Sequence, residues 1–212
     1  MPWFYYIIRA IIRVIVLLLT RFQVEGQENI PTEGPLLVVA NHLSLADPPL
    51  LGISIKRKTA FMAKRNLFRC KAIGYFIRGF GAFPIDRERL DREGIRQTYQ
   101  VLSDGLVLVM FPEGTRSRNG QLRPAFSGAA RIASRSGVPI LPVAISGTEQ
   151  IEHPSWLFKR PVIKVHFGEP FYLPRPASNM SRQELINFTE ILMQRIAEIL
   201  PRQYRGNYDN QN

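Results

Sequence analysis

The sequence predicts an α/β fold in which a mostly parallel mixed sheet is flanked by helices. Apolar runs of strand length recur along the chain, and segments with helical periodicity separate several of them. Strands that alternate with helices pack as a layered sheet with helices on its faces, so this order favours mostly parallel strands. The length of 212 residues suits one domain with a full hydrophobic core.

The helices and strands can be predicted from the local pattern of apolar residues. The predicted strands are Leu36–Ala40, Thr59–Lys64, Ala82–Ile85, Leu106–Phe111, Ile140–Ile145 and Val162–Phe167. The predicted helices are Arg87–Ser103, Ala125–Ser136 and Ser181–Leu200, the last opening with the capping-box sequence SRQE. With no internal repeat or long linker, we expect one catalytic domain over residues 25–200, between an N-terminal helix (1–24) and a polar tail (201–212) that frays.

The first 24 residues predict a hydrophobic, amphipathic helix associated with a membrane. They contain no acidic residue and consist mainly of aliphatic and aromatic side chains. A helix over Met1–Thr20 would be about 30 Å long, enough to cross a bilayer. Arg9 and Arg13 would each cost about 2.5–3.5 kcal/mol near the bilayer centre, so a helix lying in the interface, with both guanidinium groups among the headgroups, is favoured. The alternative is a helix packed on the protein's own core.

The charge of the chain indicates the kind of partner it binds, and its cysteine content indicates the compartment. The formal net charge is +11, and 22 of the 28 basic residues are Arg, a side chain suited to bidentate recognition of phosphate. We therefore expect an anionic partner, and charge alone leaves both nucleic acid and a membrane surface open. The single cysteine, Cys70, excludes an internal disulfide and a zinc site built from several cysteines, and it agrees with a reducing compartment.

His42 and Asp47 follow the first predicted strand, in the stretch ANHLSLADPP. In one continuous helix, side chains five positions apart would point about 140° away from each other. Pro48 disfavours the helical region for Asp47 and is typical of a helix start, so we expect a strand-to-helix turn that brings the two side chains together. A histidine oriented by a carboxylate can act as a general base. Taken alone, the segment is better explained as an Asp cap beside an unrelated His.

A second polar stretch, FPEGTRSRNG, follows the predicted strand Leu106–Phe111. Gly114 favours a tight turn, Thr115 supplies a hydroxyl, and Arg116 supplies a guanidinium group, so such a turn can hold a phosphate. Glu113 is unusual beside an anion. It is interpreted as a ligand of a substrate hydroxyl or as the ion-pair partner that positions an arginine. A basic surface turn is the alternative for this segment alone.

Two further stretches complete a pattern. In the stretch GFGAFPIDRER, Arg87 lies just past a strand, where it could extend the phosphate site, and Asp86 could cap the next helix. The stretch GVPILPVAISG is an apolar strand bounded by prolines. NHLSLADP, GAFPIDR, FPEGTRS and VPILPV, in this order, resemble the four blocks of the glycerolipid acyltransferase family. The resemblance covers roughly residues 36–147.

The resemblance implies a role for particular residues. It implies that His42 is the general base and Asp47 its partner, and that the acceptor's phosphate and glycerol are bound by Arg87, Glu113, Gly114, Thr115 and Arg116. It also implies an acyl thioester donor, either acyl-CoA or acyl-ACP, which makes acyl carrier protein an expected partner. No other cofactor is expected, and no metal, because the sequence shows no cluster of metal ligands. Ser127 stands where family members commonly carry Lys, and Arg123 or Arg131 could substitute as the phosphate contact.

The expected function is therefore transfer of a fatty acyl group to the sn-2 hydroxyl of 1-acyl-sn-glycerol 3-phosphate (lysophosphatidic acid), forming phosphatidic acid. The acceptor hydroxyl attacks the thioester directly, so no protein nucleophile is required. We expect the protein at the cytoplasmic face of a membrane, bound to an anionic phospholipid surface. A nucleic-acid partner is not expected, because no aromatic and basic RNA-binding signature is present. The alternatives are acyl transfer to another lysophospholipid or lipid acceptor, and a non-catalytic module that binds anionic lipid.

Overall fold

The computed structural model describes residues 2–86, 91–152, 156–175 and 180–209. Its seven strands form one sheet in the order β1-β7-β6-β2-β5-β3-β4. They are β1 (Arg21–Glu25), β2 (Leu36–Ala40), β3 (Thr59–Lys64), β4 (Ala82–Ile85), β5 (Val107–Met110), β6 (Ile140–Ser146) and β7 (Val162–Phe167). Every neighbouring pair is parallel except β6 and β7. The predicted mostly parallel mixed sheet is confirmed.

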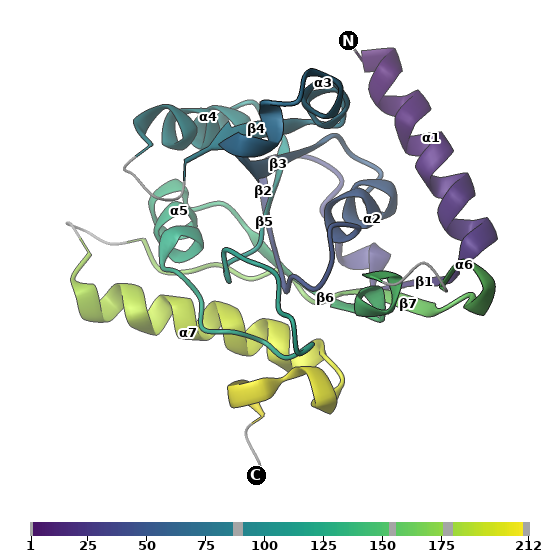
Figure 1. Ribbon diagram of the computed structural model, residues 1–212. Helices are drawn as coiled ribbons and strands as arrows, with labels where there is room; N and C mark the ends of the chain where they lie inside the picture. Colours follow the sequence, from purple (N-terminus) through teal and green to yellow (C-terminus); the bar gives the residue numbers. More distant parts are fainter. Residues whose placement is uncertain (1, 87–90, 153–155, 176–179, 210–212) are drawn as a thin grey trace.

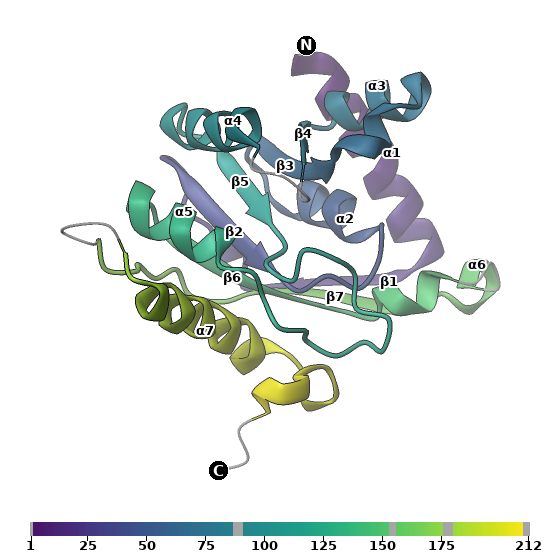
Figure 2. The ribbon, with the colours of Figure 1, turned by 60° about the vertical axis from the view of Figure 1, so that its left-hand side comes forward.

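Helices cover both faces of this sheet (Figures 1 and 2). The α-helices are α1 (Pro2–Leu19), α2 (Asp47–Ser54), α3 (Lys71–Gly79), α4 (Arg92–Ser103), α5 (Gly128–Ser136), α6 (Trp156–Lys159) and α7 (Arg182–Ile199). Short 3₁₀ helices are η1 (Gln27–Asn29), η2 (Arg65–Phe68), η3 (Thr148–Glu152), η4 (Arg202–Tyr204) and η5 (Gly206–Tyr208). Apolar side chains of α1 and α2 pack on one face, and those of α5 and α7 on the other.

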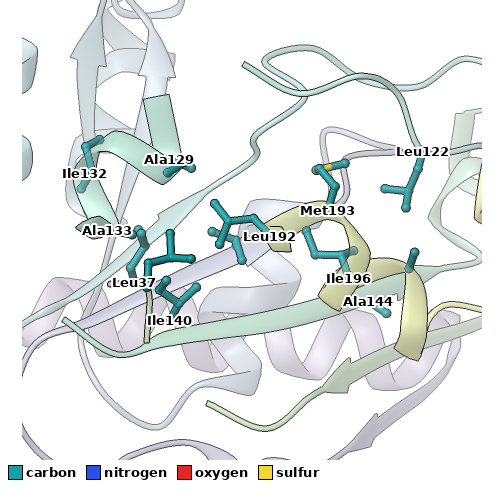
Figure 3. Close-up of a cluster of buried hydrophobic side chains, with 14 of the residues drawn as sticks. Leu37, Leu122, Ala129, Ile132, Ala133, Ile140, Ala144, Leu192, Met193 and Ile196 are labelled. Carbon is teal, nitrogen blue, oxygen red and sulfur yellow. The ribbon is translucent and has the colours of Figure 1, made fainter. Parts of the chain in front are cut away.

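Strand β2 explains why the sheet is buried on both sides. Its five residues are fully buried, and successive side chains point to opposite faces. Leu36, Val38 and Ala40 belong to the cluster under α1 and α2, whereas Leu37 and Val39 belong to the cluster under α5 and α7. Figure 3 shows this second cluster, in which β2 and β6 meet the inner sides of α5 and α7. The continuous apolar run therefore reflects a central strand.

Several elements differ from the sequence prediction, among them α3 and α6, which were not predicted, and β1, α4 and α5. Strand β1 was not predicted; it is short and half exposed, and it lies across the suggested boundary at residue 24, pairing with β7 at the sheet edge. Helix α4 begins at Arg92, with Asp91 as its cap in place of Asp86: the Asp91 carboxylate accepts the Gly94 N–H at 2.9 Å. Helix α5 begins three residues later than predicted, at Gly128.

Helix α1 is apolar on two sides. Tyr5 and Ile8 are buried against the domain, so the helix does pack on the protein's own core, while its other side exposes a row of aliphatic and aromatic residues. Arg9 does not point outward as expected, because its guanidinium donates to the carbonyls of Ile53 and Lys56 at the end of α2. Arg13 is exposed. Within the described residues, no helix has the length and apolar character needed to cross a membrane.

The described part of the C-terminal segment, residues 201–209, packs on the domain, contrary to the expectation that the tail frays; residues 210–212 lie outside the described residues. Residues 201–209 form η4 and η5, and Tyr204 and Tyr208 are buried in the cluster under α7. The Tyr204 carbonyl accepts the Leu122 N–H at 2.8 Å. Two aromatic side chains in a polar sequence thus tie the end of the chain to the loop that follows β5.

Candidate active site

The two polar turns lie side by side because their strands are neighbours. β2 and β5 pair in parallel, so the turn after Ala40 and the turn after Met110 leave the same edge of the sheet. Asn41 fastens the first turn on its other side: its amide donates to the Ile145 carbonyl at 2.8 Å and its oxygen accepts the Ile145 N–H at 2.7 Å. The end of β2 is therefore held between β5 and β6.

His42 and Asp47 form the contact predicted from their spacing. His42 Nδ1 lies 2.8 Å from Asp47 Oδ2. The same oxygen accepts the backbone N–H groups of Leu43 and Ser44, at 2.7 and 2.8 Å. Because a carboxylate only accepts, Nδ1 carries the proton and Nε2 keeps a free lone pair. The fully buried Asp47 thus sets the tautomer and orientation of the imidazole.

The imidazole is packed as well as hydrogen-bonded. Its ring stacks on Phe111, with centroids 4.2 Å apart and planes inclined by 24°. The His42 carbonyl accepts the Ser117 N–H at 2.7 Å. The side chain keeps 12% of its surface exposed, enough for a reactant to reach its edge. Phe111 and Ser117, like Asn41, support the site without any signal in the sequence that singled them out.

Glu113 connects the two turns through backbone amides. One carboxylate oxygen accepts the His42 N–H at 2.9 Å, and the other accepts the Arg123 N–H at 3.1 Å. Burial raises the pKa of this carboxyl from 4.5 to about 7, and the two amide donors only partly offset that effect. Through these two contacts, Glu113 holds the histidine turn against the loop after β5.

The residues expected to bind phosphate lie on the open side of this loop. Gly114 adopts a φ of 70°, and a Cβ there would come within 2.8 Å of the Phe126 ring, so the turn requires glycine. Thr115 and Arg116 are exposed. The Arg116 carbonyl accepts from the Arg123 guanidinium at 3.4 Å, which brings Arg123 beside the expected phosphate site. Arg131, the other suggested substitute for lysine, is exposed on α5.

A mostly apolar cavity of about 240 Å³ borders Phe111, the ring on which the histidine stacks. It is lined by Met62, Ile85, Asp86, Met110, Phe111, Gly114 and Phe126. Arg87, the last predicted site residue, lies outside the described residues. In the described part of the chain, no three His, Cys, Asp or Glu side chains gather as metal ligands would. The arrangement offers an oriented proton acceptor between a cationic loop and an apolar cavity.

The comparisons with known proteins agree with this arrangement. A family model described as Acyltransferase matches residues 21–146. A 1-acyl-sn-glycerol-3-phosphate acyltransferase of Bacillus subtilis is 32% identical over 89% of this chain and 92% of its own length. One of Streptococcus pneumoniae is 36% identical over 63% of this chain and 49% of its own. The crystal structure of the 1-acyl-sn-glycerophosphate (LPA) acyltransferase PlsC from Thermotoga maritima matches with a TM-score of 0.70 and 30% identity, over 89% of this chain and 76% of that one.

Proposed function

The chain belongs to the acyltransferase family, and from this membership we propose that it transfers an acyl group from a thioester to the sn-2 hydroxyl of 1-acyl-sn-glycerol 3-phosphate, forming phosphatidic acid. The names of its relatives in Bacillus subtilis and Thermotoga maritima support this acceptor. Membership in a family of enzymes removes the support for a non-catalytic lipid-binding module. The donor is proposed to be acyl-CoA or acyl-ACP, so acyl carrier protein is a proposed partner.

The observation that carries the mechanism is the short contact between His42 Nδ1 and Asp47 Oδ2, at 2.8 Å. In the proposed reaction, His42 Nε2 takes the proton of the acceptor hydroxyl as its oxygen attacks the thioester carbon. The negative charge of Asp47 stabilises the imidazolium that forms. The carbon–sulfur bond then breaks, and the departing thiolate takes the proton back from Nε2. Every atom of the reaction comes from donor or acceptor, so no covalent enzyme intermediate is required.

The acceptor is proposed to lie with its phosphate on the loop after β5. Arg116 and Arg87 would supply guanidinium groups, and Gly114 and Thr115 would supply the turn amides and a hydroxyl. Glu113 is proposed to bind the glycerol part of the acceptor and, through its two amide contacts, to keep this loop in register with His42.

Membrane association is the second part of the proposal. The outward side of α1 exposes Trp3, Tyr6, Ile7, Ile11, Val14, Ile15, Leu17 and Leu18. We propose that this side lies in the acyl region of one leaflet while Arg13 meets the headgroups. The acceptor is itself a membrane lipid, so such an arrangement brings it to the site from the bilayer. The cytoplasmic leaflet is proposed because the free, exposed Cys70 agrees with a reducing compartment.

Thiol release from acyl-CoA and from acyl-ACP, each with and without lysophosphatidic acid, tests the reaction in detergent micelles. Release that requires the acceptor and falls by about 10²–10⁴-fold in His42→Ala supports the proposed reaction. His166→Ala is the matched control, since His166 lies on β7 outside the site, and it is expected to keep full activity. Acceptor-independent release would instead identify a thioester hydrolase. Equal rates with lysolipids that lack a terminal phosphate would overturn the role of Arg116.

A further inference from the structure

Helix α6 ends in an unusually exposed aromatic side chain. It lies in the connection between β6 and β7, and Phe158 is 92% exposed, more than any other large hydrophobic residue in the described part of the chain. Its neighbour Leu157 is 44% exposed. Neither side chain contributes to the apolar clusters of the domain, so folding of the domain alone gives no reason for their apolar character.

Several contacts hold this helix beside the end of α1. The Arg160 guanidinium donates to the Leu17 carbonyl at 3.3 Å, and Pro161 accepts the Arg21 N–H at 2.9 Å. Trp156 turns inward and lines an apolar cavity of about 290 Å³ together with Ile15 and Val16 of α1. Figure 1 shows α6 next to the C-terminal end of α1. The helix is therefore fastened by its tryptophan, with its tip directed away from the core.

The tip and the end of α1 together expose an apolar surface, named here the α1–α6 patch. It comprises Val14, Leu17, Leu18, Leu157 and Phe158, all of them exposed. Basic side chains accompany it: Lys159 and Arg160 follow Phe158 directly, and both are exposed. Neither residues 1–24 nor residues 156–168 contain an acidic side chain. Aromatic and aliphatic groups next to the cations of these two segments match the boundary between anionic headgroups and acyl chains.

We propose that the tip of α6 inserts into the same anionic phospholipid leaflet as α1 and acts as a second membrane anchor. This inference rests on the proposed function, in which α1 lies on a membrane. Phe158 and Leu157 enter the acyl region, while Lys159 and Arg160 bind lipid phosphates. The cavity lined by Trp156 is also lined by Ala46 and Pro49, which flank Asp47 in the histidine turn. Two anchors thereby fix how the catalytic turn faces the bilayer, which a single helix would leave free to rotate.

Vesicle sedimentation tests the anchor with phosphatidylcholine vesicles, with and without added phosphatidylglycerol. Phe158→Ser is expected to bind the mixed vesicles roughly tenfold more weakly than the parent. Ile186→Ser is the matched control, because Ile186 is 49% exposed on α7, across the sheet from α1; its binding should not change. Lys159→Gln should weaken binding only when phosphatidylglycerol is present. Equal binding by Phe158→Ser and Ile186→Ser would overturn the proposal.

A label reports insertion directly. In a Cys70→Ser background, Phe158→Cys and Ile186→Cys are each labelled with a polarity-sensitive fluorophore. The label at residue 158 is expected to shift to the blue on vesicles and to be quenched by brominated acyl chains, while the label at residue 186 stays in water. A label at residue 158 that remains in water while the protein is bound would overturn the anchor. A blue shift that appears without vesicles as protein concentration rises would instead assign the patch to a second copy of the chain.

Activity in detergent separates the two proposals. If the parent and Phe158→Ser both transfer acyl groups in micelles, and Phe158→Ser binds vesicles as tightly as the parent, the anchor is refuted and the proposed reaction is not. Absence of transfer by the parent would refute the reaction, and the labelling result would still decide whether α6 enters the leaflet.

Discussion

Asp47 organises the histidine turn through a single oxygen. Its Oδ2 accepts from the His42 ring and from the amides of Leu43 and Ser44. Two of these donors belong to the backbone, so the carboxylate is held in place even when the imidazole changes its protonation state. Its other oxygen is buried and accepts no hydrogen bond from the described part of the chain. All three donors therefore converge on the oxygen that faces the imidazole.

Asp47→Asn is expected to lower kcat by about 10²–10⁴-fold while changing KM for the acceptor little. The amide oxygen can replace Oδ2 as the acceptor, so the turn persists, but the neutral side chain no longer stabilises an imidazolium. Steady-state kinetics in micelles measure the effect, with thermal unfolding as the control for a folded variant. A loss confined to KM would show that Asp47 shapes the acceptor site and does not assist the base.

Glu113 is expected to make stability depend on pH. Its pKa is raised to about 7 in the folded protein from 4.5, so between these values the folded state holds a proton that the unfolded state has released. The stabilising contribution is complete below pH 4.5 and is lost as the pH rises through about 7, by about 3 kcal/mol at most. Urea unfolding across this range should show the decline in the parent and a flatter profile in Glu113→Gln. Parallel profiles would refute the raised pKa.

Helix α1 packs on the core with one face and exposes apolar side chains on the opposite face. Ile7 is 47% exposed and Ile8 is 4% exposed, although they are adjacent and identical. The helical turn of about 100° per residue separates them onto different faces. A deletion of α1 would therefore damage the core and any membrane contact together.

The two isoleucines form a matched pair for substitution. Ile8→Ala should lower the free energy of unfolding by about 2–5 kcal/mol, because it opens a cavity under the helix. Ile7→Ala should change it by less than about 0.5 kcal/mol and weaken binding to vesicles. Denaturant unfolding and vesicle sedimentation measure the two effects. Equal losses of stability in both variants would contradict the assigned orientation of α1.

The C-terminal segment connects the loops that leave β5 and β6, the two strands on either side of β2. The Tyr204 hydroxyl donates to Glu149 at 2.8 Å and accepts the Gly147 N–H at 3.2 Å, both in the connection after β6. Its carbonyl accepts the Leu122 N–H in the loop after β5. Burial raises the pKa of Tyr208, and the Glu190 and Glu113 carboxylates add to the shift.

Tyr204→Phe is expected to cost about 1–3 kcal/mol of unfolding free energy, because the ring still fills its place while a buried amide and a carboxylate lose their partner. Tyr172→Phe, at a residue that is 67% exposed, should have no measurable effect. Chemical denaturation compares the two. If Tyr204→Phe is as stable as the parent, the hydroxyl contacts do not contribute to this connection.

At the scale of the whole molecule, charge and apolar surface are expected to act together on membranes. With a net charge of +11, binding to vesicles that contain phosphatidylglycerol should weaken steeply as salt rises from about 10 mM to about 1 M, since the screening length falls from about 30 Å to about 3 Å. Binding to neutral vesicles should change little. Sedimentation at a series of salt concentrations measures both. Salt-independent binding to anionic vesicles would leave the apolar surface as the sole attraction.

Local patterns were sufficient for the central sheet and for one contact of the site. Strands β2, β3, β4 and β7 have the predicted bounds. Strand β2 is a continuous apolar run buried on both faces, whereas β7 alternates buried residues with more exposed ones, and both patterns can be read from local sequence. The contact between His42 and Asp47 was also predictable, since five residues and a proline largely determine the turn that brings them together. Both inferences depend on residues close in sequence.

Only the tertiary structure shows the features that depend on contacts between residues distant in sequence. Strand β1 is recognisable only by its pairing with β7 at the sheet edge, and the C-terminal tyrosines are buried against residues of α7 and Leu122, which are distant in sequence from one another. Glu113 reaches the His42 amide because β5 lies beside β2. Local sequence thus determined the strands, the histidine turn and the charge of the protein. Packing decided which loops meet, which face of α1 is buried and where Phe158 is exposed, because those outcomes require surfaces that form only when the sheet assembles.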